Sequence, residues 1–465
     1  MKLIIIGCGA AGGTTAQFAR KADRKAEIIV INRENRAQYS RCGLPYAISG
    51  KIKNFEDLIE FNETWFAKNN IKLLLGHEVT GIEPKGRVID VKDLETGKEE
   101  KMSYDSLVIA TGASASIPQI DGIFADKERK ILKENAAVLR TLEDGMKISK
   151  QVVKGKNAVI IGGGFIGLET AEALYERGMD VTVVEYLPNI LLQMSDNDIA
   201  ELMLEKLKDK IHFILNSKAV RVIGEERIEG VVVQNNSDKT ETMIPADLVV
   251  VAAGNRPNTE IAKMAGCEIG ITNGIKVNAR CETNVDGIYA VGDCTEYYDF
   301  ATGAPILVGL GTIAVKQGKV AGTNAVLGAQ GKEEMPRGIL ITRGTELFEA
   351  KIAGVGPTQV ALEKAGIKAI VGKYTGSTLP HYYPGGVPLV VKVLSHPESG
   401  KILGAQIFGE KEVFQRINVF AVAILSEMTL ETFSKLETVY APPIAPTLDA
   451  MTIAADVALL RMRKR

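Results

Sequence analysis

Two glycine-rich turns and one cysteine are the residues of this chain whose types and spacing are most suited to chemistry. The first turn, Gly7-Cys8-Gly9-Ala10-Ala11-Gly12, opens the sequence, and Gly162-Gly163-Gly164-Phe165-Ile166-Gly167 repeats its spacing in mid-chain. Cys42 follows the first turn. Because this glycine spacing is typical of dinucleotide sites, the pattern indicates two nucleotides with a thiol beside one of them, an arrangement suited to moving electrons to sulfur.

The elements around each turn must be a strand, a helix and a second strand if the turn is to hold a pyrophosphate. In the first unit we expect a strand over 3–6, a helix over 14–22 and a strand over 28–31. The second unit repeats this order with a strand over 157–161, a helix over 168–178 and a strand over 181–184. The pyrophosphate would then lie at a helix N-terminus, where free N–H groups favour an anion.

The glycines of the first turn have separate expected tasks. Gly7 allows the tight turn, Gly9 lets a pyrophosphate approach the backbone, and Gly12 lets helix and strand pack closely. The second turn repeats this pattern.

The residue that ends the second strand of each unit discriminates between ligands. Glu185 holds this place in the second unit, where a carboxylate accepts hydrogen bonds from ribose hydroxyls and repels a 2′-phosphate. We therefore expect NADH rather than NADPH, with NADPH left open. Asn32 holds the place in the first unit, and its amide can still bond a ribose hydroxyl.

Further motifs extend over the whole chain. They are 107–112 and its echo 248–254, which look like strand-to-glycine crossings, the segment Gly287-Ile-Tyr-Ala-Val-Gly-Asp293, and Tyr440-Ala-Pro-Pro443. With these motifs the sequence resembles the FAD-dependent pyridine nucleotide-disulfide oxidoreductases. The resemblance is to their single-cysteine branch of coenzyme A-disulfide reductases, NADH oxidases, NADH peroxidases and persulfide or polysulfide reductases.

This resemblance implies an α/β fold with two Rossmann-like domains, for FAD and NAD, and a C-terminal α+β dimerisation domain. The expected limits are 1–118 and 249–335 for the FAD domain, 119–248 for the NAD domain and 336–465 for the dimerisation domain. A homodimer or homotetramer follows, with Asp293 at the flavin ribityl chain. The cofactor-binding residues would be Gly7, Gly9, Ala10, Ala11, Gly12, Asn32, Ala110, Thr111, Gly112, Gly162, Gly164, Phe165, Ile166, Gly167, Glu185, Gly254, Gly292 and Asp293.

Cys42 matches the redox cysteine of this branch in its segment Tyr39-Ser-Arg-Cys-Gly-Leu-Pro-Tyr46. Its place before a short expected helix, next to Arg41, should favour the thiolate over the thiol. No second cysteine lies near it, so its resting partner would be a small thiol or an extra sulfur. We expect Cys8, Cys267, Cys281 and Cys294 to be packed structural residues.

The substrate is suggested by what stands near the cysteine. Peroxidases and water-forming oxidases of the branch carry a histidine in the first turn, whereas this chain has Ala10, as coenzyme A-disulfide reductases do. By the same resemblance Tyr440, and one or both of Tyr382 and Tyr383, would reach the site from a partner subunit and protonate a departing thiolate. Coenzyme A itself is a possible bound ligand, held by Thr14, Phe18, Lys21 and Arg41.

A smaller expectation concerns Glu169, near the start of the second expected helix, and Lys51. These residues could form an ion pair near flavin N5, or lie apart on the surface.

The composition of the chain excludes several classes of function and of binding partner. The net charge of -1 over 465 residues provides no electrostatic basis for binding nucleic acid or an anionic membrane. Apolar runs are too short to span a bilayer. An odd number of cysteines without a CxxC pair and four scattered histidines support neither a disulfide framework nor a metal site, so we expect no metal. Because the apolar runs, including that of residues 1–6, are too short for a membrane span or a signal peptide, we expect a cytoplasmic protein.

The sequence therefore favours an NAD(P)H-dependent flavoprotein that reduces low-molecular-weight disulfides or persulfides, such as coenzyme A disulfide, coenzyme A persulfide or polysulfide. Two alternatives stay open. One is an NADH oxidase that reduces oxygen. The other is an electron-transfer or redox-sensing flavoprotein that serves a protein partner.

Overall fold

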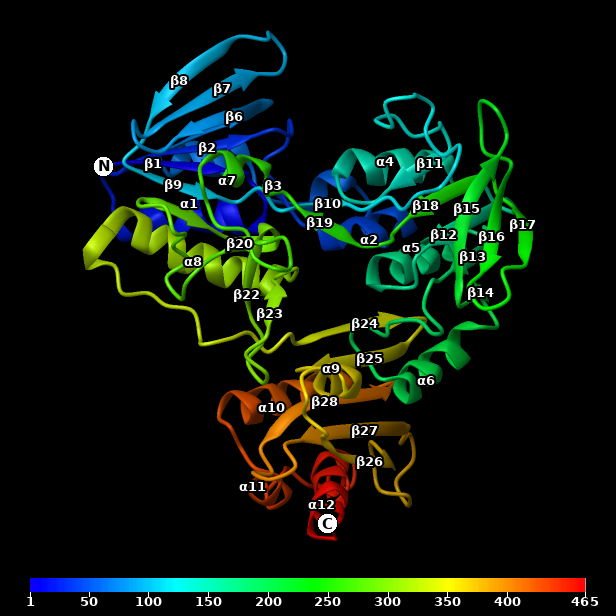
Figure 1. The fold of residues 1–465 in the computed structure, drawn as a ribbon. Helices are drawn as coiled ribbons and strands as arrows, with labels where there is room; N and C mark the ends of the chain where they lie inside the picture. The colour runs from blue at the N-terminus through cyan, green and yellow to red at the C-terminus, as the bar shows by residue number, and fades with distance from the viewer. Residues whose placement is uncertain (465) are drawn as a thin grey trace.

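The structure, a computed structural model, describes residues 1–464. Its first domain is built on a parallel sheet in the strand order β21-β9-β1-β2-β5. The helix α1 (Ala10–Ala22) follows β1, and α8 (Gly311–Leu327) packs against α1 (Figure 1). The strands are β1 (Lys2–Ile6), β2 (Glu27–Asn32), β5 (Ile71–Leu75), β9 (Ser106–Ile109) and β21 (Ile288–Ala290).

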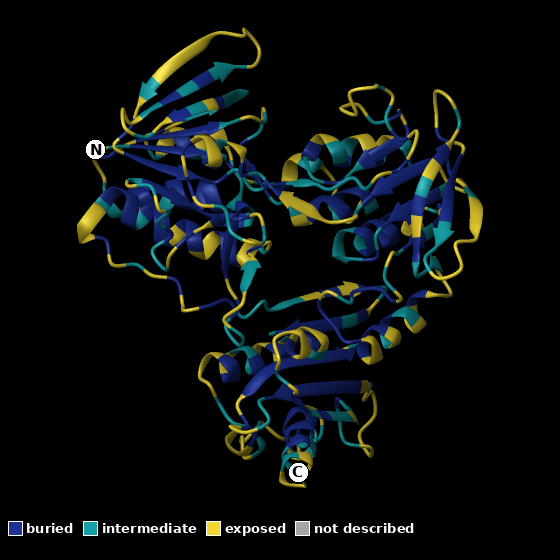
Figure 2. Ribbon diagram, viewed as in Figure 1, coloured by how far each residue is buried: buried dark blue, intermediate teal, exposed yellow. Residues whose placement is uncertain are grey.

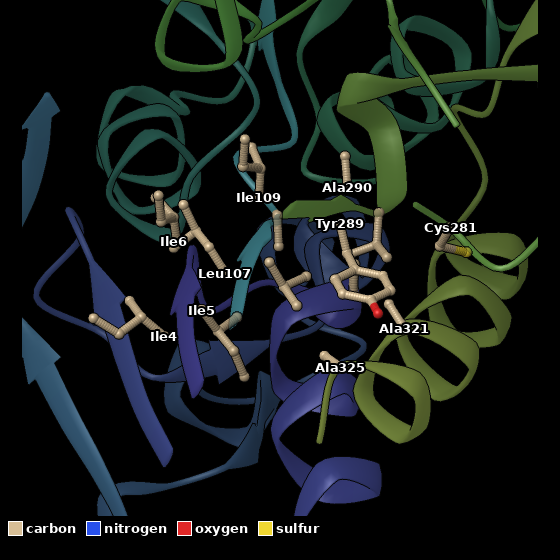
Figure 3. Packing of buried hydrophobic residues seen from close by; sticks show 14 of the residues in the cluster. Ile4, Ile5, Ile6, Leu107, Ile109, Cys281, Tyr289, Ala290, Ala321 and Ala325 are labelled. Carbon is tan, nitrogen blue, oxygen red and sulfur yellow. The ribbon is translucent and has the colours of Figure 1, made fainter. Parts of the chain in front are cut away.

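The core of this domain explains why its central strands are continuous apolar runs. Figure 3 shows side chains from both faces of this sheet, with Ile4 and Leu107 on one face and Ile5 and Tyr289 on the other, toward Ala321 of α8. Parallel strands are buried on both faces, so they carry isoleucine, leucine and valine without alternation.

The middle domain repeats this plan with the parallel order β11-β18-β12-β13-β14. Its second glycine turn joins β12 to α5, as the first joins β1 to α1. A three-stranded antiparallel sheet, β15-β16-β17, covers it on one side. The elements are β11 (Ala136–Val138), α4 (Leu142–Gln151), β12 (Asn157–Ile161), α5 (Phe165–Glu176), β13 (Asp180–Val184), α6 (Asn197–Leu207), β14 (His212–Ile214), β15 (Ser217–Ile223), β16 (Gly230–Asn235), β17 (Glu241–Pro245) and β18 (Leu248–Val251).

The C-terminal domain is a five-stranded antiparallel sheet in the order β24-β25-β28-β27-β26, with helices packed on it (Figure 1). Figure 2 shows that its strands, like those of the two parallel sheets, are mostly buried. The elements are β24 (Arg343–Leu347), β25 (Ala350–Val355), α9 (Gln359–Lys364), β26 (Ile370–Ser377), β27 (Pro388–Ser395), β28 (Ile402–Gly409), α10 (Val413–Leu425), α11 (Leu430–Ser434) and α12 (Ala450–Arg463).

Smaller elements connect and extend the first domain. A two-stranded ribbon, β10 with β19, joins it to the middle domain, and the sheet β6-β7-β8 lies at its edge. The bounds are β3 (Gln38–Tyr39), α2 (Leu44–Ser49), β4 (Ile59–Phe61), α3 (Glu63–Lys68), β6 (His77–Glu83), β7 (Val88–Asp93), β8 (Glu99–Ser103), β10 (Ala113–Ala115), β19 (Asn255–Pro257), α7 (Glu260–Met264), β20 (Ile275–Lys276), β22 (Thr295–Tyr298) and β23 (Pro305–Leu307), with 3₁₀ turns at Arg41–Gly43, Phe55–Leu58, Gly292–Cys294 and Gly328–Gln330.

The expected fold class, two Rossmann-like domains and a C-terminal α+β domain, is confirmed. Both fingerprint helices begin earlier than expected, at Ala10 and Phe165, because each starts directly after the middle glycine of its turn. The strand β18 crosses the expected limit at residue 248, and we propose that it belongs to the middle domain. Within the described residues, no helix combines the length and apolar character needed to cross a bilayer.

Candidate active site

The first glycine turn is shaped by close backbone contacts. Gly7 has a φ of 105°, and a Cβ there would collide with the carbonyl of Ala110. A Cβ at Gly12 would collide with the carbonyl of Gly7. At Gly9, by contrast, a Cβ would meet no atom within 4 Å, and α1 begins there without a side-chain cap. The N–H groups at the start of α1 are therefore open to an anion.

The second turn repeats this geometry. Gly162 has a φ of 119°, and a Cβ there would collide with the carbonyl of Ala252. A Cβ at Gly167 would collide with the carbonyl of Gly162, while a Cβ at Gly164, at the uncapped start of α5, would meet no atom within 4 Å. The chain therefore contains two anion cradles of the same design.

Asn32, expected at a ribose, makes its hydrogen bonds within the protein. Its Oδ1 accepts from the N–H of Cys8 at 3.1 Å, and its Nδ2 donates to the carbonyl of Arg36 at 2.8 Å. In this structure its side chain therefore fixes the first turn against the loop after β2.

Glu185 braces the second turn in a related way. Its carboxylate accepts from the N–H of Gly163 at 2.5 Å and from the N–H of Leu187 at 2.7 Å. A carboxylate thus stands at the end of β13 beside the second turn, where we expected it.

Asp293, in the 3₁₀ turn Gly292–Cys294 of the first domain, forms an ion pair with Arg140, which lies just before α4 of the middle domain. The Arg140 guanidinium donates to Asp293 at 2.8 Å and to the carbonyl of Ala113 at 2.9 Å. Between β9 and β10, the Thr111 hydroxyl donates a hydrogen bond to the carbonyl of Asn258 at 2.6 Å. No sequence motif pointed to Arg140, whose neighbour Thr141 signals only the start of α4.

Cys42 is the one exposed cysteine of the chain, since the other four are buried as expected. It lies in the 3₁₀ turn Arg41–Gly43 that leads into α2. A Cβ at Gly43 would collide with Leu58, so the glycine after the cysteine is needed for close packing. The turn therefore holds the thiol at the surface on a tightly packed base.

The expected role of Arg41 as a cation for Cys42 is wrong in this structure. Its guanidinium pairs instead with Glu34 and donates to the carbonyl of Arg140, each at 2.5 Å. The pKa of Cys42 is raised above its ordinary value, first by desolvation and then by the charges of Glu169 and Asp293. Arg140 opposes this rise without cancelling it, so the expectation that this turn favours the Cys42 thiolate over the thiol is also wrong in this structure.

The expected ion pair between Lys51 and Glu169 is also wrong. Lys51 lies 2.9 Å from Glu176 and 3.5 Å from Glu172, which are further along α5. Glu169 instead accepts a hydrogen bond from the Thr345 hydroxyl of β24 at 2.8 Å, and burial raises its pKa. Glu169 is thus an acid near Cys42 that Lys51 does not neutralise.

Replacing Glu169 by Gln should make the Cys42 thiol more acidic. The carboxylate raises the pKa of Cys42, so its removal moves the pH profile of thiol alkylation to lower pH. We expect the rate of alkylation by iodoacetamide near neutral pH to rise about threefold to tenfold. Glu176→Gln, on the same helix, is the matched control and should leave the profile unchanged. Identical profiles for all three proteins would show that Glu169 has no influence on the thiol.

The predicted tyrosines lie together, but away from Cys42 of the same subunit. The hydroxyls of Tyr382 and Tyr440 are 3.1 Å apart, both side chains are exposed, and Tyr383 is adjacent. This hydrogen bond lowers the pKa of Tyr440. Their loops precede β27 and α12, whereas α5 and Glu169 contact β24 at the opposite edge of the sheet (Figure 1).

The residues expected to hold coenzyme A separate into two groups. Phe18 and Lys21 lie at the surface of α1, with the Lys21 ammonium 4.5 Å from the Phe18 ring centre and Lys319 at 5.9 Å. Thr14 is buried against α8, and Arg41 is paired with Glu34. Because Thr14 is buried and Arg41 is already paired, Phe18 and Lys21 are the two of these residues that remain available to a ligand in this structure.

Comparison with known proteins identifies the class. The family described as pyridine nucleotide-disulphide oxidoreductase matches residues 1–318, and its dimerisation domain matches residues 344–452. The chain belongs to this family of oxidoreductases, and the resemblance seen in the sequence is confirmed. Members of the family use FAD and NAD(P)H. The two open, uncapped helix starts fit the phosphates of both groups.

Individual relatives divide between two activities. The chain is 37% identical to an NADH oxidase of Methanocaldococcus jannaschii, over 100% of both chains. It is 32% identical to an NAD(P)H coenzyme A polysulfide/persulfide reductase of Pyrococcus horikoshii, over 98% of both. Among solved structures, an NAD-dependent persulfide reductase from A. fulgidus is similar with a TM-score of 0.92 and 32% identity, over 100% of this chain and 84% of that one.

Proposed function

We propose that this chain is an NADH-dependent FAD flavoprotein that reduces low-molecular-weight disulfides or persulfides, with coenzyme A-linked species as the main substrates. The observation that carries the proposal is the single exposed thiol of Cys42. This thiol lies near the ion pair of Arg140 and Asp293, whose charges act on it. Five free cysteines also fit a cytoplasmic setting, where thiols are kept reduced.

The residues that would hold the cofactors follow from the two turns. FAD would lie with its pyrophosphate at Gly9 and its ribityl chain at Asp293, and NADH with its pyrophosphate at Gly164 and a ribose at Glu185. Bound FAD would supply to the Cys42 sulfur the two electrons that NADH delivers.

The sulfur chemistry falls to Cys42. Its thiolate attacks one sulfur of a disulfide, the S–S bond breaks, and one thiolate leaves as Cys42 becomes a mixed disulfide. Two electrons and a proton then release the second thiol and restore the thiolate. With a persulfide, attack on the outer sulfur leaves a thiol and a Cys42 persulfide, and the same two electrons release hydrogen sulfide.

A proton for the departing thiolate would come from Tyr440 of a partner subunit, with Tyr382 and Tyr383 beside it. The loop that carries Tyr440 exposes several apolar side chains, as expected of a surface that a second copy covers. They are Leu436, Val439, Ile444 and Leu448, which are between 37% and 69% exposed. We therefore propose a homodimer as the working unit.

Coenzyme A would lie along α1, with its phosphates near Lys21 and Lys319 and Phe18 between the two cations. Arg41 would join this surface only by leaving Glu34, and Thr14 is left out of it because it is buried.

Tyr440→Phe should slow the reduction of coenzyme A disulfide and coenzyme A persulfide about tenfold to a hundredfold, because the proton donor is lost. Oxygen uptake should stay unchanged, since it needs no thiol leaving group. The matched control is Tyr298→Phe, because Tyr298 and Tyr440 are both 45% exposed. Equal rates for Tyr440→Phe and wild type on both sulfur substrates would exclude this role.

A mixed dimer tests whether the tyrosine acts across subunits. One subunit carries Cys42→Ser and the other Tyr440→Phe. If each site combines Cys42 of one subunit with Tyr440 of the other, the mixed dimer has one intact site and regains about half of the wild-type rate per dimer. If both residues act in one subunit, no intact site forms and no activity is regained.

The second candidate is an NADH oxidase, and the relative at 37% identity favours it. Ala10 opposes it, because the first turn then offers no histidine to protonate a reduced oxygen species. Steady-state rates with coenzyme A disulfide, coenzyme A persulfide, polysulfide, peroxide and oxygen would rank the two functions. The proposal requires sulfur substrates to be reduced faster than oxygen at equal concentration.

A further inference from the structure

Alternate side chains of β24 point toward the middle domain. The Thr345 hydroxyl donates to Glu169 of α5. Arg343, two residues earlier and therefore on the same face of the strand, donates to the carbonyl of Gln193 in the loop after β13. One face of this strand of the C-terminal domain thus contacts both α5 and the loop of Gln193.

The second glycine turn is connected to both of these contacts. The turn leads directly into α5, and its Gly163 carbonyl accepts from the N–H of Leu191, two residues before Gln193, at 3.0 Å. Gly164 faces open space at the start of α5. Arg343 is therefore held by the same loop that bonds the anion cradle of the middle domain.

The Arg343 guanidinium has fewer partners than several other arginines that are half-buried or buried. Arg140 and Arg416 pair with carboxylates, and Arg20 donates to four backbone carbonyls. Among residues 1–464, no carboxylate lies within 4.0 Å of the half-buried Arg343, and its guanidinium donates to one carbonyl. Burial alone lowers the pKa of Arg343 to about 10. A half-buried guanidinium with most of its donors unused can bind an anion that lies beside it.

We propose that Arg343 is a phosphate-binding residue that holds the diphosphate of the pyridine nucleotide together with the N–H groups at the start of α5. A guanidinium donates to two phosphate oxygens at once, and a helix N-terminus adds its own donors. This inference rests on the proposed use of a pyridine nucleotide. It adds a ligand contact from the C-terminal domain, which neither glycine turn predicts.

ADP-ribose binding to the FAD-loaded protein, measured by calorimetry, tests this role without turnover. Arg343→Gln should weaken ADP-ribose about tenfold to a hundredfold, as the loss of a charge-assisted hydrogen bond implies. Arg343→Lys should recover part of the affinity. Adenosine, which has no phosphate, should bind all three proteins equally. Arg221→Gln, a surface arginine of β15, should match wild type.

The outcomes separate this inference from the proposed function. Unchanged ADP-ribose affinity in Arg343→Gln would overturn the role of Arg343 alone. Equal losses for ADP-ribose and adenosine would also overturn it, because Arg343 would then only hold the loop of Gln193. Failure of the wild-type protein to bind ADP-ribose would overturn the proposed use of the nucleotide and this inference with it.

Discussion

Cys42→Ser should lower kcat for coenzyme A disulfide and coenzyme A persulfide by at least about a thousandfold, as removal of a catalytic nucleophile does. A serine hydroxyl cannot form the mixed disulfide. No other thiol can take over, because Cys8, Cys267, Cys281 and Cys294 are at most 5% exposed. Binding of FAD and its reduction by NADH should persist. Steady-state rates with both substrates measure the loss.

The control for this variant is Cys267→Ser, which removes a buried thiol whose hydrogen-bond partner is the Thr283 hydroxyl at 3.8 Å. It should keep the wild-type rate. A Cys42→Ser protein that retains a tenth or more of the sulfur-reducing activity would instead assign Cys42 a structural role. The electron-transfer or sensing alternative, in which a protein partner meets the flavin edge, would then be favoured.

Lys392→Ala should lower the free energy of unfolding more than any of the other substitutions. The ammonium of Lys392, in β27, lies 2.9 Å from Asp196 and 2.8 Å from Asp198, at the start of α6. The side chains of Lys392 and Asp196 are 5% and 7% exposed. Removing the cation leaves a buried carboxylate uncompensated, which costs about 3 to 5 kcal/mol. The midpoint of urea unfolding should fall accordingly.

Lys373→Ala is the matched comparison, because Lys373 binds the same Asp198 at 2.7 Å but is 34% exposed. Its loss should cost less than about 1 kcal/mol. Similar losses for the two lysines would contradict the view that this ion pair owes its strength to burial. The ion pair of Lys392 and Asp196 also supports the candidate active site. Asp196 directly follows the loop of Gln193, and this loop bonds the second glycine turn.

The fold could be predicted from the sequence because its signals are local. A glycine turn between an apolar run and a helix specifies a strand–helix–strand unit in each parallel sheet, and β12 was predicted over the residues it occupies. The two fingerprint helices were placed too late, because small residues such as Ala11 and Gly13 in the first turn of α1 give no apolar periodicity.

The side-chain partners could not be predicted, because they depend on direction and on distant segments. Arg41 is next to Cys42 in sequence, yet its guanidinium turns to Glu34. Arg140, which does act on Cys42, comes from the start of the middle domain and has no motif of its own. Lys51 pairs with Glu172 and Glu176 rather than Glu169, and sequence spacing cannot choose among acids on one helix face.

Anaerobic titration with NADH tests the central claim most directly, with the wild-type and Cys42→Ser proteins compared by flavin absorbance. If the sulfur of residue 42 exchanges electron pairs with the cofactor, the oxidised wild-type protein should take up two electrons before its flavin bleaches. The serine variant should bleach from the first addition. Equal electron uptake by both proteins would contradict the claim that this thiol is the redox centre.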